Sequence, residues 1–312
     1  MNGAARKPPA LHPGETVAVV APASAVDAGR LDRGLHAIAA MGYRAKVSPR
    51  VLGRSGILAG EDAARAAELN AAFADPEVKA IFCARGGYGS GRLLPLIDFA
   101  AAARRPKIFL GFSDLTFLLN ALVERARMVC FHGPMVAMDF ARGLTERSRE
   151  QLQALLSGRQ QSFALKARDV IRPGNAQGEV VGGCLSILAA MMATPYAPRF
   201  EERILFLEDT GEKAYRVDRM LVQLKQAGVL SKVAGIVFGA LSPPAQQPEE
   251  AGVIRRFVEH QVADLGCPVL FGIEAGHGTE NLTLPLGLPA RIDGSGGRLI
   301  FDESAVSRDQ DR

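Results

Sequence analysis

The 312-residue sequence contains no tryptophan, and aromatic residues make up only 6% of it. Sites that stack single-stranded bases need exposed aromatic side chains, so this class of site is not expected. Basic residues number 37 against 33 acidic ones and are spread along the chain rather than gathered in a stripe. Because a protein that grips a phosphate backbone needs such a stripe, nucleic acid is excluded as the expected partner.

Cysteine is also scarce, with four residues that lie far apart in apolar or glycine-rich stretches. No two of them have the CxxC spacing of a redox motif or the close spacing of structural zinc ligands. We therefore expect buried, reduced thiols of an intracellular protein and no metal site. The residues are Cys83, Cys130, Cys184 and Cys267.

Long apolar runs are absent. The longest uncharged stretch, Val180 to Pro198, is interrupted by glycine and proline, so its apolar helix covers only about Cys184 to Thr194. A bilayer needs roughly 20 apolar residues, so we interpret this segment as a buried helix. The residues before Glu15 contain no apolar run of signal-peptide length. These features predict a cytoplasmic protein without a membrane partner.

What the sequence does contain is an alternation of strand-like and helix-like segments. The length suggests about two domains, and 48% hydrophobic residues supply a core for each. Continuous apolar runs, rather than alternating ones, are typical of parallel strands covered on both faces. The first half therefore predicts an α/β domain with a parallel sheet. Its expected strands are Thr16–Ala21, Arg44–Ser48, Ala80–Ala84, Lys107–Gly111 and Met128–Phe131.

From Ala141 to Gln177 the sequence becomes rich in Arg, Gln and Ser, with a weak apolar pattern. We place the connection between domains there. This gives an N-terminal domain over 1–140, a connecting segment over 141–177 and a second α/β domain over 178–312. The second domain begins with Gly178–Gly183 and the buried helix, and its expected strands are Arg203–Leu207, Gly235–Phe238, Pro268–Ile273, Leu282–Leu284 and Arg298–Phe301.

Ser113 stands at a strand-to-helix junction, in the sequence Gly111-Phe112-Ser113-Asp114. Open α/β sheets place their sites at the carboxyl ends of strands, so this hydroxyl could be a nucleophile. The Asp114 amide would then point out of a helix N-terminus toward an oxyanion. The motif is not the GxSxG elbow, because Leu115 fills the last glycine position. On this motif alone, a helix cap at Ser113 is the favoured interpretation.

A glycine-rich loop, RGGYGSGR over residues 85–92, follows the strand Ala80–Ala84. Its glycines allow close backbone approach to a ligand and can direct amides at an anion. A dinucleotide-binding loop would need a third glycine where Arg92 stands, and the GK[ST] of a P-loop is missing. The loop is either a tight turn or a binding loop.

Two further motifs follow strands of the second half. Glu208 and Asp209 close the strand Arg203–Leu207, where a carboxylate can orient a histidine, although surface turn chemistry explains them equally well. His277 lies between Gly276 and Gly278 after the strand Pro268–Ile273, so it is exposed on a loop and suited to act as a base.

Ser113, Glu208 and His277 together supply a nucleophile, an orienting carboxylate and a base. A serine hydroxyl is a weak nucleophile at neutral pH and needs an imidazole to remove its proton. The imidazole in turn needs a carboxylate to fix its tautomer. Because Ser113 belongs to the first expected domain and the other two to the second, we expect the active site in the cleft between them.

Several long motifs occur in one order along nearly the whole chain, from about Gly14 to the end of the second domain. In this order and spacing the sequence resembles the LD-carboxypeptidase family of serine peptidases. The motifs are ARGGYGSGRLLPLIDF, IFLGFSDLTFLLNAL, FHGPM, GGCLSILAAMMATPY, ILFLEDTGEKAYRVDRMLVQLKQAGVL, GIVFGAL and PVLFGIEAGHGTENLTLPLG.

The resemblance implies a Rossmann-like N-terminal domain, a smaller α/β C-terminal domain, a homodimer, and no metal or cofactor. It implies hydrolysis of murein tetrapeptide, with release of its terminal D-alanine, in cytoplasmic peptidoglycan recycling. The family's nucleophile, acid and histidine fall on Ser113, Glu208 and His277. Its oxyanion hole maps to the backbone amides of Asp114 and Gly87.

The groups that bind the substrate's carboxylates are left open by the resemblance. On chemistry alone the candidates are Arg85, Tyr88, Arg92 and Arg216. The same family includes immunity peptidases that cleave a peptidyl- or aminoacyl-nucleotide of the microcin C type, which is the alternative activity. A non-catalytic ligand-binding α/β protein, with the glycine loop as an anion nest and Ser113 as a cap, is the alternative from another class.

Overall fold

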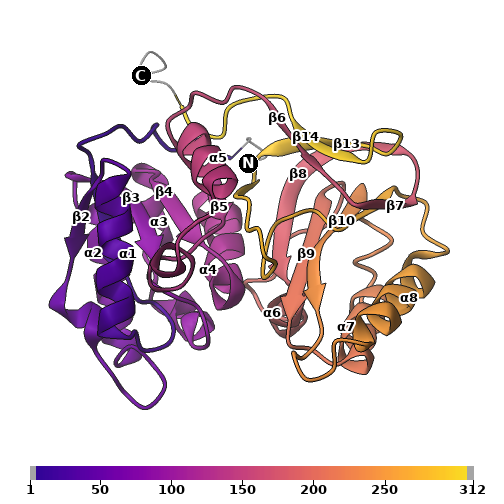
Figure 1. The fold of residues 1–312 in the computed structure, drawn as a ribbon, viewed down its shortest axis with the longest axis horizontal. Coiled ribbons are helices and arrows are strands. Elements are labelled where there is room, and N and C mark those ends of the chain that lie inside the picture. Colours follow the sequence, from indigo (N-terminus) through magenta and orange to yellow (C-terminus); the bar gives the residue numbers. More distant parts are fainter. Residues whose placement is uncertain (1–4, 308–312) are drawn as a thin grey trace. The chain divides into compact units, whose positions relative to one another are not determined.

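The computed structural model describes residues 5–307, which fold as two compact units (Figure 1). Unit 1 contains the chain up to Gln161, then Leu282–Gly287 and the residues from Ser304 onward. Unit 2 contains Ser162–Asn281 and Leu288–Glu303. The chain therefore passes between the units at four points, after residues 161, 281, 287 and 303.

Unit 1 is built on a six-stranded sheet with the order β12-β5-β4-β3-β1-β2. The first five strands of the chain are mutually parallel, and β12 joins β5 antiparallel. The strands are β1 (Thr16–Val20), β2 (Arg44–Val47), β3 (Val78–Cys83), β4 (Ile108–Gly111), β5 (Cys130–His132) and β12 (Leu284–Leu286). The helices are α1 (Ala28–Ala40), α2 (Asp62–Ala74), α3 (Phe99–Arg104), α4 (Thr116–Ala121) and α5 (Glu146–Leu156), with 3₁₀ turns at Pro49–Leu52, Ser90–Leu96 and Ser113–Leu115 and π turns at Leu122–Ala126 and Val136–Phe140.

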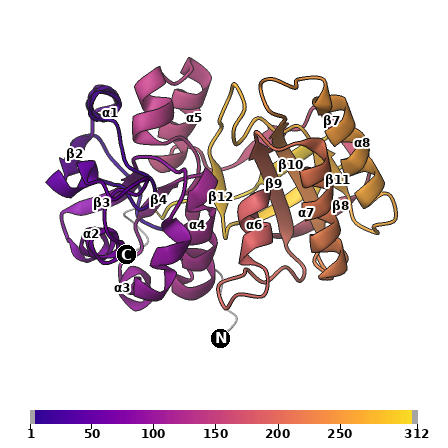
Figure 2. The same ribbon diagram turned by 90° about the horizontal axis from the view of Figure 1, so that it is seen from below.

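Helices cover both faces of this sheet. Figure 2 shows α1 and α5 on one side of the strands and α2, α3 and α4 on the other. Strands β1, β4 and β5 are buried along their whole length, as their continuous apolar sequences predict. Helix α1 begins where the Asp27 carboxylate accepts a hydrogen bond from the Arg30 amide at 2.8 Å.

Unit 2 is built on an eight-stranded mixed sheet with the order β6-β14-β13-β8-β9-β10-β11-β7. Strands β8, β9, β10 and β11 are parallel, and the long β8 also pairs antiparallel with β13. The strands are β6 (Phe163–Lys166), β7 (Asp169–Arg172), β8 (Asn175–Cys184), β9 (Ile204–Thr210), β10 (Gly235–Ser242), β11 (Val269–Phe271), β13 (Pro289–Asp293) and β14 (Arg298–Phe301). The helices are α6 (Leu185–Met191), α7 (Ala214–Gln226) and α8 (Glu250–Val262).

The fold class expected from the sequence, α/β in two parts with a Rossmann-like parallel sheet in the first, is confirmed. The expected boundaries differ from the two units in three places. The segment expected as a connection, 141–177, forms α5 in unit 1 and β6, β7 and the start of β8 in unit 2. Residues 282–287 and those from Ser304 onward, both expected within the C-terminal domain, belong to unit 1.

Two of the composition arguments can be compared with the structure. Cys83, Cys130 and Cys184 are buried free thiols, whereas Cys267 is half-buried, and burial raises the pKa of each thiol. No helix within residues 5–307 is both long enough and apolar enough to cross a membrane.

Candidate functional site

His277 and Glu208 are in direct contact in unit 2. The Glu208 carboxylate, at the end of β9, is fully buried. Its Oε2 atom lies 2.7 Å from Nδ1 of His277 and also accepts the backbone N–H of His277 at 3.0 Å. An acceptor at Nδ1 fixes the tautomer, so the neutral ring carries its proton on Nδ1 and its lone pair on Nε2. This is the arrangement that a general base needs.

Gly276 and Asn281 hold the backbone of this contact. Gly276 has a φ of +96°, and a Cβ atom there would lie 2.4 Å from the Glu208 carboxylate oxygen, so any other residue would collide with it. The Gly276 amide donates to Oδ1 of the buried Asn281 at 2.9 Å. The loop is therefore fixed at residue 276 from one side by Glu208 and from the other by Asn281.

Asp209, the neighbour of Glu208, has a different position and a different partner. Its Oδ2 accepts the Ser186 amide at 2.7 Å, which ties the end of β9 to the first turn of α6. Burial raises the pKa of Asp209, and the bonds from Ser186 and Thr210 oppose that shift. Asp209 thus anchors β9, while Glu208 carries the histidine.

Ser113 lies in unit 1, on the turn directly after β4. It adopts a φ of +64°, a conformation that a residue with a side chain reaches only at a cost of about 1 kcal/mol or more. Its neighbour Asp114 is buried, with Oδ2 accepting the Ser90 amide at 2.8 Å and its carbonyl accepting the Ser90 hydroxyl at 2.6 Å. The turn is strained, and the glycine loop holds it.

The glycine loop packs closely on the serine turn. A Cβ atom built on Gly86 would lie 3.0 Å from Cβ of Ser113 and 3.3 Å from the Asp114 nitrogen. The next residue, Gly87, has a φ of +100° and lies against the Ser24 side chain. The sequence motifs at 85–92 and 111–114 therefore form one structure, with the Gly87 and Asp114 amides in neighbouring turns.

The residues suggested for substrate carboxylates have varied surroundings. Arg85 donates from Nη1 to the Ala25 carbonyl at 3.1 Å, and the side chain of Tyr88 is exposed. Arg92 pairs with Asp62 across the surface at 2.8 Å. Arg216 pairs with Glu212 at 3.5 Å on the exposed face of α7 and contacts the Tyr215 hydroxyl. Both Arg92 and Arg216 already have anionic partners on their own unit.

A cavity of about 610 Å³ opens beside His277 within unit 2. Its walls come from the ends of β10 and β11, the turn between β6 and β7, and the loop that carries the histidine. It is lined by Arg168, residues 239–243, Ala251, residues 271–274 and residues 277–280. Among residues 5–307, no group of three or more His, Cys, Asp and Glu side chains is arranged as a metal site.

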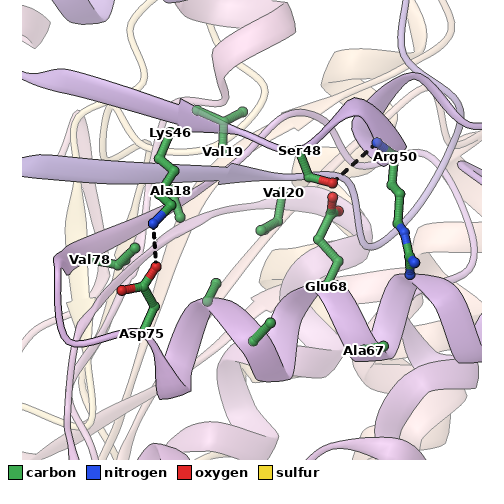
Figure 3. Close-up of a pocket in the computed structure, with 12 residues that line it drawn as sticks. Ala18, Val19, Val20, Lys46, Ser48, Arg50, Ala67, Glu68, Asp75 and Val78 are labelled. Atoms are coloured by element: carbon green, nitrogen blue, oxygen red, sulfur yellow. Dashed lines mark hydrogen bonds and ion pairs between the residues drawn. The ribbon is translucent and has the colours of Figure 1, made fainter.

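Unit 1 holds a separate cavity of about 430 Å³ between β1, β2 and α2 (Figure 3). Lys46 pairs with Asp75 at its rim, with 2.7 Å between Nζ and Oδ2. Glu68 reaches into it, and burial raises the pKa of that carboxyl. None of the site residues expected from the sequence lines this cavity.

The structure brings the predicted site residues into two groups, one on each unit. Ser113, Asp114, Gly87, Arg85 and Tyr88 lie on the serine turn and the glycine loop of unit 1, and Glu208, His277 and Arg216 lie on unit 2. Sequence reasoning did not assign Gly86, Asn281 or Arg168 any role. Asn281 acts through one bond to the backbone amide of Gly276, and Arg168 lies against Gly272 far later in the chain, so neither has a local sequence pattern. Gly86 belongs to the glycine-rich loop, which the sequence does single out.

Both halves of the sequence match descriptions of one family. Residues 17–133 match the LD-carboxypeptidase N-terminal domain, and residues 177–292 match the LD-carboxypeptidase C-terminal domain. The chain is 37% identical to the probable murein peptide carboxypeptidase of Bacillus subtilis, over 92% of this chain and 91% of that one. It is 33% identical to the murein tetrapeptide carboxypeptidase of Pseudomonas aeruginosa, over 89% and 93% of the two chains.

Two solved structures share this fold. The muramoyltetrapeptide carboxypeptidase from Oxalobacter formigenes superposes with a TM-score of 0.83 at 32% identity, covering 91% of this chain and 97% of that one. The microcin C7 self-immunity protein in its wild-type apo state superposes with a TM-score of 0.86 at 23% identity, covering 96% and 99%. The second likeness shows the fold alone.

Proposed function

This chain belongs to the LD-carboxypeptidase family and is a carboxypeptidase, and we propose that it is a serine peptidase that removes the terminal D-alanine of murein tetrapeptide. The bond cleaved joins the L-centre of a diamino acid to D-alanine. The observation that carries the proposal is the buried Glu208 carboxylate on Nδ1 of His277, 2.7 Å away, in a chain of this family. Relatives named for murein peptides support the substrate class.

In the proposed mechanism His277 is the base and Ser113 the nucleophile. Nε2 of His277 takes the Ser113 hydroxyl proton while Oγ bonds to the carbonyl carbon of the diamino acid. The imidazolium that results is stabilised by Glu208. It then gives its proton to the nitrogen of D-alanine as the carbon–nitrogen bond breaks. Water completes the cycle: it loses a proton to His277 as its oxygen bonds to the acyl carbon, and the imidazolium returns that proton to Oγ as the ester bond breaks, which frees the acid product and restores Ser113.

The oxyanion of the tetrahedral intermediate needs hydrogen-bond donors that are in place before the reaction. We assign this role to the backbone amides of Asp114 and Gly87. Their support is the packing of Gly86 against Ser113 and Asp114, together with the bonds from Ser90 that hold Asp114. Removing such a donor typically lowers kcat by about 10²–10³.

We further propose that the enzyme acts in the cytoplasm as a homodimer, on muropeptides released during peptidoglycan recycling. A murein tetrapeptide presents carboxylates and an exposed C-terminus to a soluble peptidase, and no helix in the described part of the chain is suited to cross a membrane. Size-exclusion chromatography with light scattering would test the dimer, which a mass near 33.2 kDa would contradict.

The first test is mass spectrometry of murein tetrapeptide incubated with the purified protein in the presence of a chelator. We expect the loss of one alanine with the wild type and none with Ser113→Ala. By analogy with other serine triads, kcat should fall by about 10⁴–10⁶ in Ser113→Ala. Near-full activity of Ser113→Ala would overturn the assignment of the nucleophile.

A matched control is Ser295→Ala, a serine on a surface turn of unit 2 whose hydroxyl bonds only to Asp293. It should cleave like the wild type. An unchanged tetrapeptide with the wild type would contradict the proposed substrate, and processed microcin C would then be the next substrate tried. If neither were cleaved and a serine-reactive phosphonate failed to label Ser113, the non-catalytic alternative would stand.

A further inference from the structure

The cavity beside His277 is lined by one permanently charged basic side chain, Arg168. It is the only arginine or lysine among the residues that line the cavity. Two acidic residues, Glu274 and Glu280, line it as well. An anionic group that enters this cavity therefore has one permanent positive charge to bind, and the two carboxylates disfavour it elsewhere along the walls.

The fold holds Arg168 in place over Gly272. A Cβ atom on Gly272 would lie 2.9 Å from Cβ of Arg168 and 3.5 Å from its Nε, so only glycine leaves room for this side chain. The residues on both sides of Arg168 are fixed too. The Ala167 amide donates to the Gly297 carbonyl at 2.8 Å, and Asp169 pairs with Arg255 at 2.9 Å.

The guanidinium of Arg168 makes no hydrogen bond or ion pair with any residue from 5 to 307. Its neighbours on the same unit differ in this respect. Arg255 bonds to Asp169 and Glu259 and lies over the ring of Phe271 at 4.5 Å, and Arg172 donates to the Ala263 carbonyl. Arg168 thus lines the cavity of the proposed base with a positive charge that no other described side chain pairs with.

We propose that Arg168 binds the free carboxylate of the leaving D-alanine and so makes the enzyme a carboxypeptidase rather than an endopeptidase. The inference rests on the proposed function. In that mechanism His277 protonates the leaving nitrogen, so the leaving residue must lie beside His277. The carboxylate of that residue is one carbon from the same nitrogen, and the cavity that holds His277 offers it Arg168.

The chemistry of the two groups explains the selectivity. A guanidinium presents two parallel N–H donors that match the two oxygens of a carboxylate. An amide in the same place, as in a chain that continues past D-alanine, carries no charge and satisfies fewer donors. Such a chain would also bring additional residues against the walls formed by Glu274 and Glu280.

The test compares murein tetrapeptide with the same peptide carrying a terminal amide. We expect the wild type to prefer the free carboxylate by about 10- to 100-fold in kcat/KM, the range of a hydrogen-bonded charge pair. Arg168→Gln should lose about that factor on the carboxylate and keep its rate on the amide. An equal loss on both substrates, or an unchanged preference, would overturn the proposal.

The matched control is Arg256→Gln, an exposed arginine on α8 that lies outside the cavity and should behave like the wild type. Binding of both peptides to Ser113→Ala, with and without Arg168→Gln, separates the two hypotheses. If the wild type cleaves neither peptide but Ser113→Ala still prefers the carboxylate through Arg168, the proposed function fails and the role of Arg168 stands. If Ser113→Ala shows no such preference, the role of Arg168 is wrong whether or not cleavage occurs.

Discussion

At the scale of single residues, the proposed base depends on a neighbour that acts through the backbone of its loop. Asn281 is buried and accepts the Gly276 amide at 2.9 Å, one residue before His277. Its side chain therefore fixes the position of the backbone at Gly276, the residue that precedes His277. We regard it as a positioning residue.

Asn281→Ala should lower kcat by about tenfold or more with little change in KM, because the Gly276 amide loses its acceptor and the contact between His277 and Glu208 loosens. Leaving that buried donor unpaired also costs about 1–3 kcal/mol of stability. Steady-state kinetics across pH provide the measurement, since a loosened contact with Glu208 shifts the lower limb of the kcat profile.

Asn281→Asp, which keeps an acceptor oxygen, is the rescue variant and should recover part of kcat. The positioning role would be contradicted if the activity lost in Asn281→Ala matched only the fraction of protein unfolded. A pH profile identical to that of the wild type would contradict it equally.

Some residues of the candidate site could be predicted from the sequence and others could not. A histidine between two glycines and a glutamate closing an apolar strand are unusual enough locally to be singled out, and they do touch. Asn281 contributes through one bond to a backbone amide, and Arg168 through its place over Gly272. Neither contact leaves a pattern in the sequence, because the first depends on how one loop folds back on itself and the second on which turn packs against Gly272.

At the scale of elements, the glycine loop and the turn after β4 act as one part. Gly86 lies where a side chain would press on both Ser113 and the Asp114 amide. The Ser90 side chain and amide then lock the other end of the loop to Asp114. A substitution in the glycine loop should thus shift the position of Ser113.

Gly86→Ala should reduce kcat by about 10- to 100-fold. The added methyl group pushes both Ser113 and the Asp114 amide away from the glycine loop by a few tenths of an ångström. The rate at which a serine-reactive phosphonate labels Ser113 should fall in parallel. Overpacking of this kind costs about 1–3 kcal/mol, so the protein should remain folded.

Gly266→Ala is the control, because a Cβ atom there would meet nothing within 4 Å. It should label like the wild type. Unchanged labelling of Gly86→Ala would show that the loop does not constrain the serine.

The elements themselves were predictable to different degrees. Continuous apolar runs such as Thr16–Val20 identified buried parallel strands correctly. Strands β6, β7 and β13 were missed because they are short and half-exposed, and the first two lie in a polar stretch. Their pairing partners, rather than their own composition, make them strands.

At the scale of the whole molecule, unit 1 is completed by a strand from near the end of the chain. Leu284 and Leu286 of β12 are fully buried, and β12 pairs antiparallel with β5. The Gln151 side chain exchanges two hydrogen bonds with the Thr283 backbone, at 2.8 and 3.0 Å. The edge of the sheet formed by the first 161 residues is thus covered by residues 283–286.

Leu284→Ala should destabilise the protein by about 2–5 kcal/mol, the cost of a cavity at a fully buried leucine. Hydrogen exchange should show the loss of protection first in β5, at 130–132, and not in β9 or β10 of unit 2. Leu52→Ala, at a position 48% exposed, should cost far less. Equal loss of protection in β9 would contradict the assignment of β12 to unit 1.

The domain boundaries could not have been predicted from the sequence, because they depend on strand pairing between segments that are distant in the chain. Composition marks a polar stretch such as 141–177, but it carries no information on which sheet a three-residue strand joins. The antiparallel partner of β12 lies about 150 residues earlier in the chain, and only the folded sheet brings the two together.

The interleaving of the two units has a consequence for how such proteins can diversify. Because the polypeptide passes between them at four points, neither unit is a continuous cassette. Recombination at a single crossover near residue 161 would join one parent's β5 to the other parent's β12. Chimeras between relatives should therefore fold only when residues 282–287 and the segment from 304 come from the same parent as the first 161 residues. A single crossover cannot meet this condition, so exchange of one whole unit between relatives needs several crossovers.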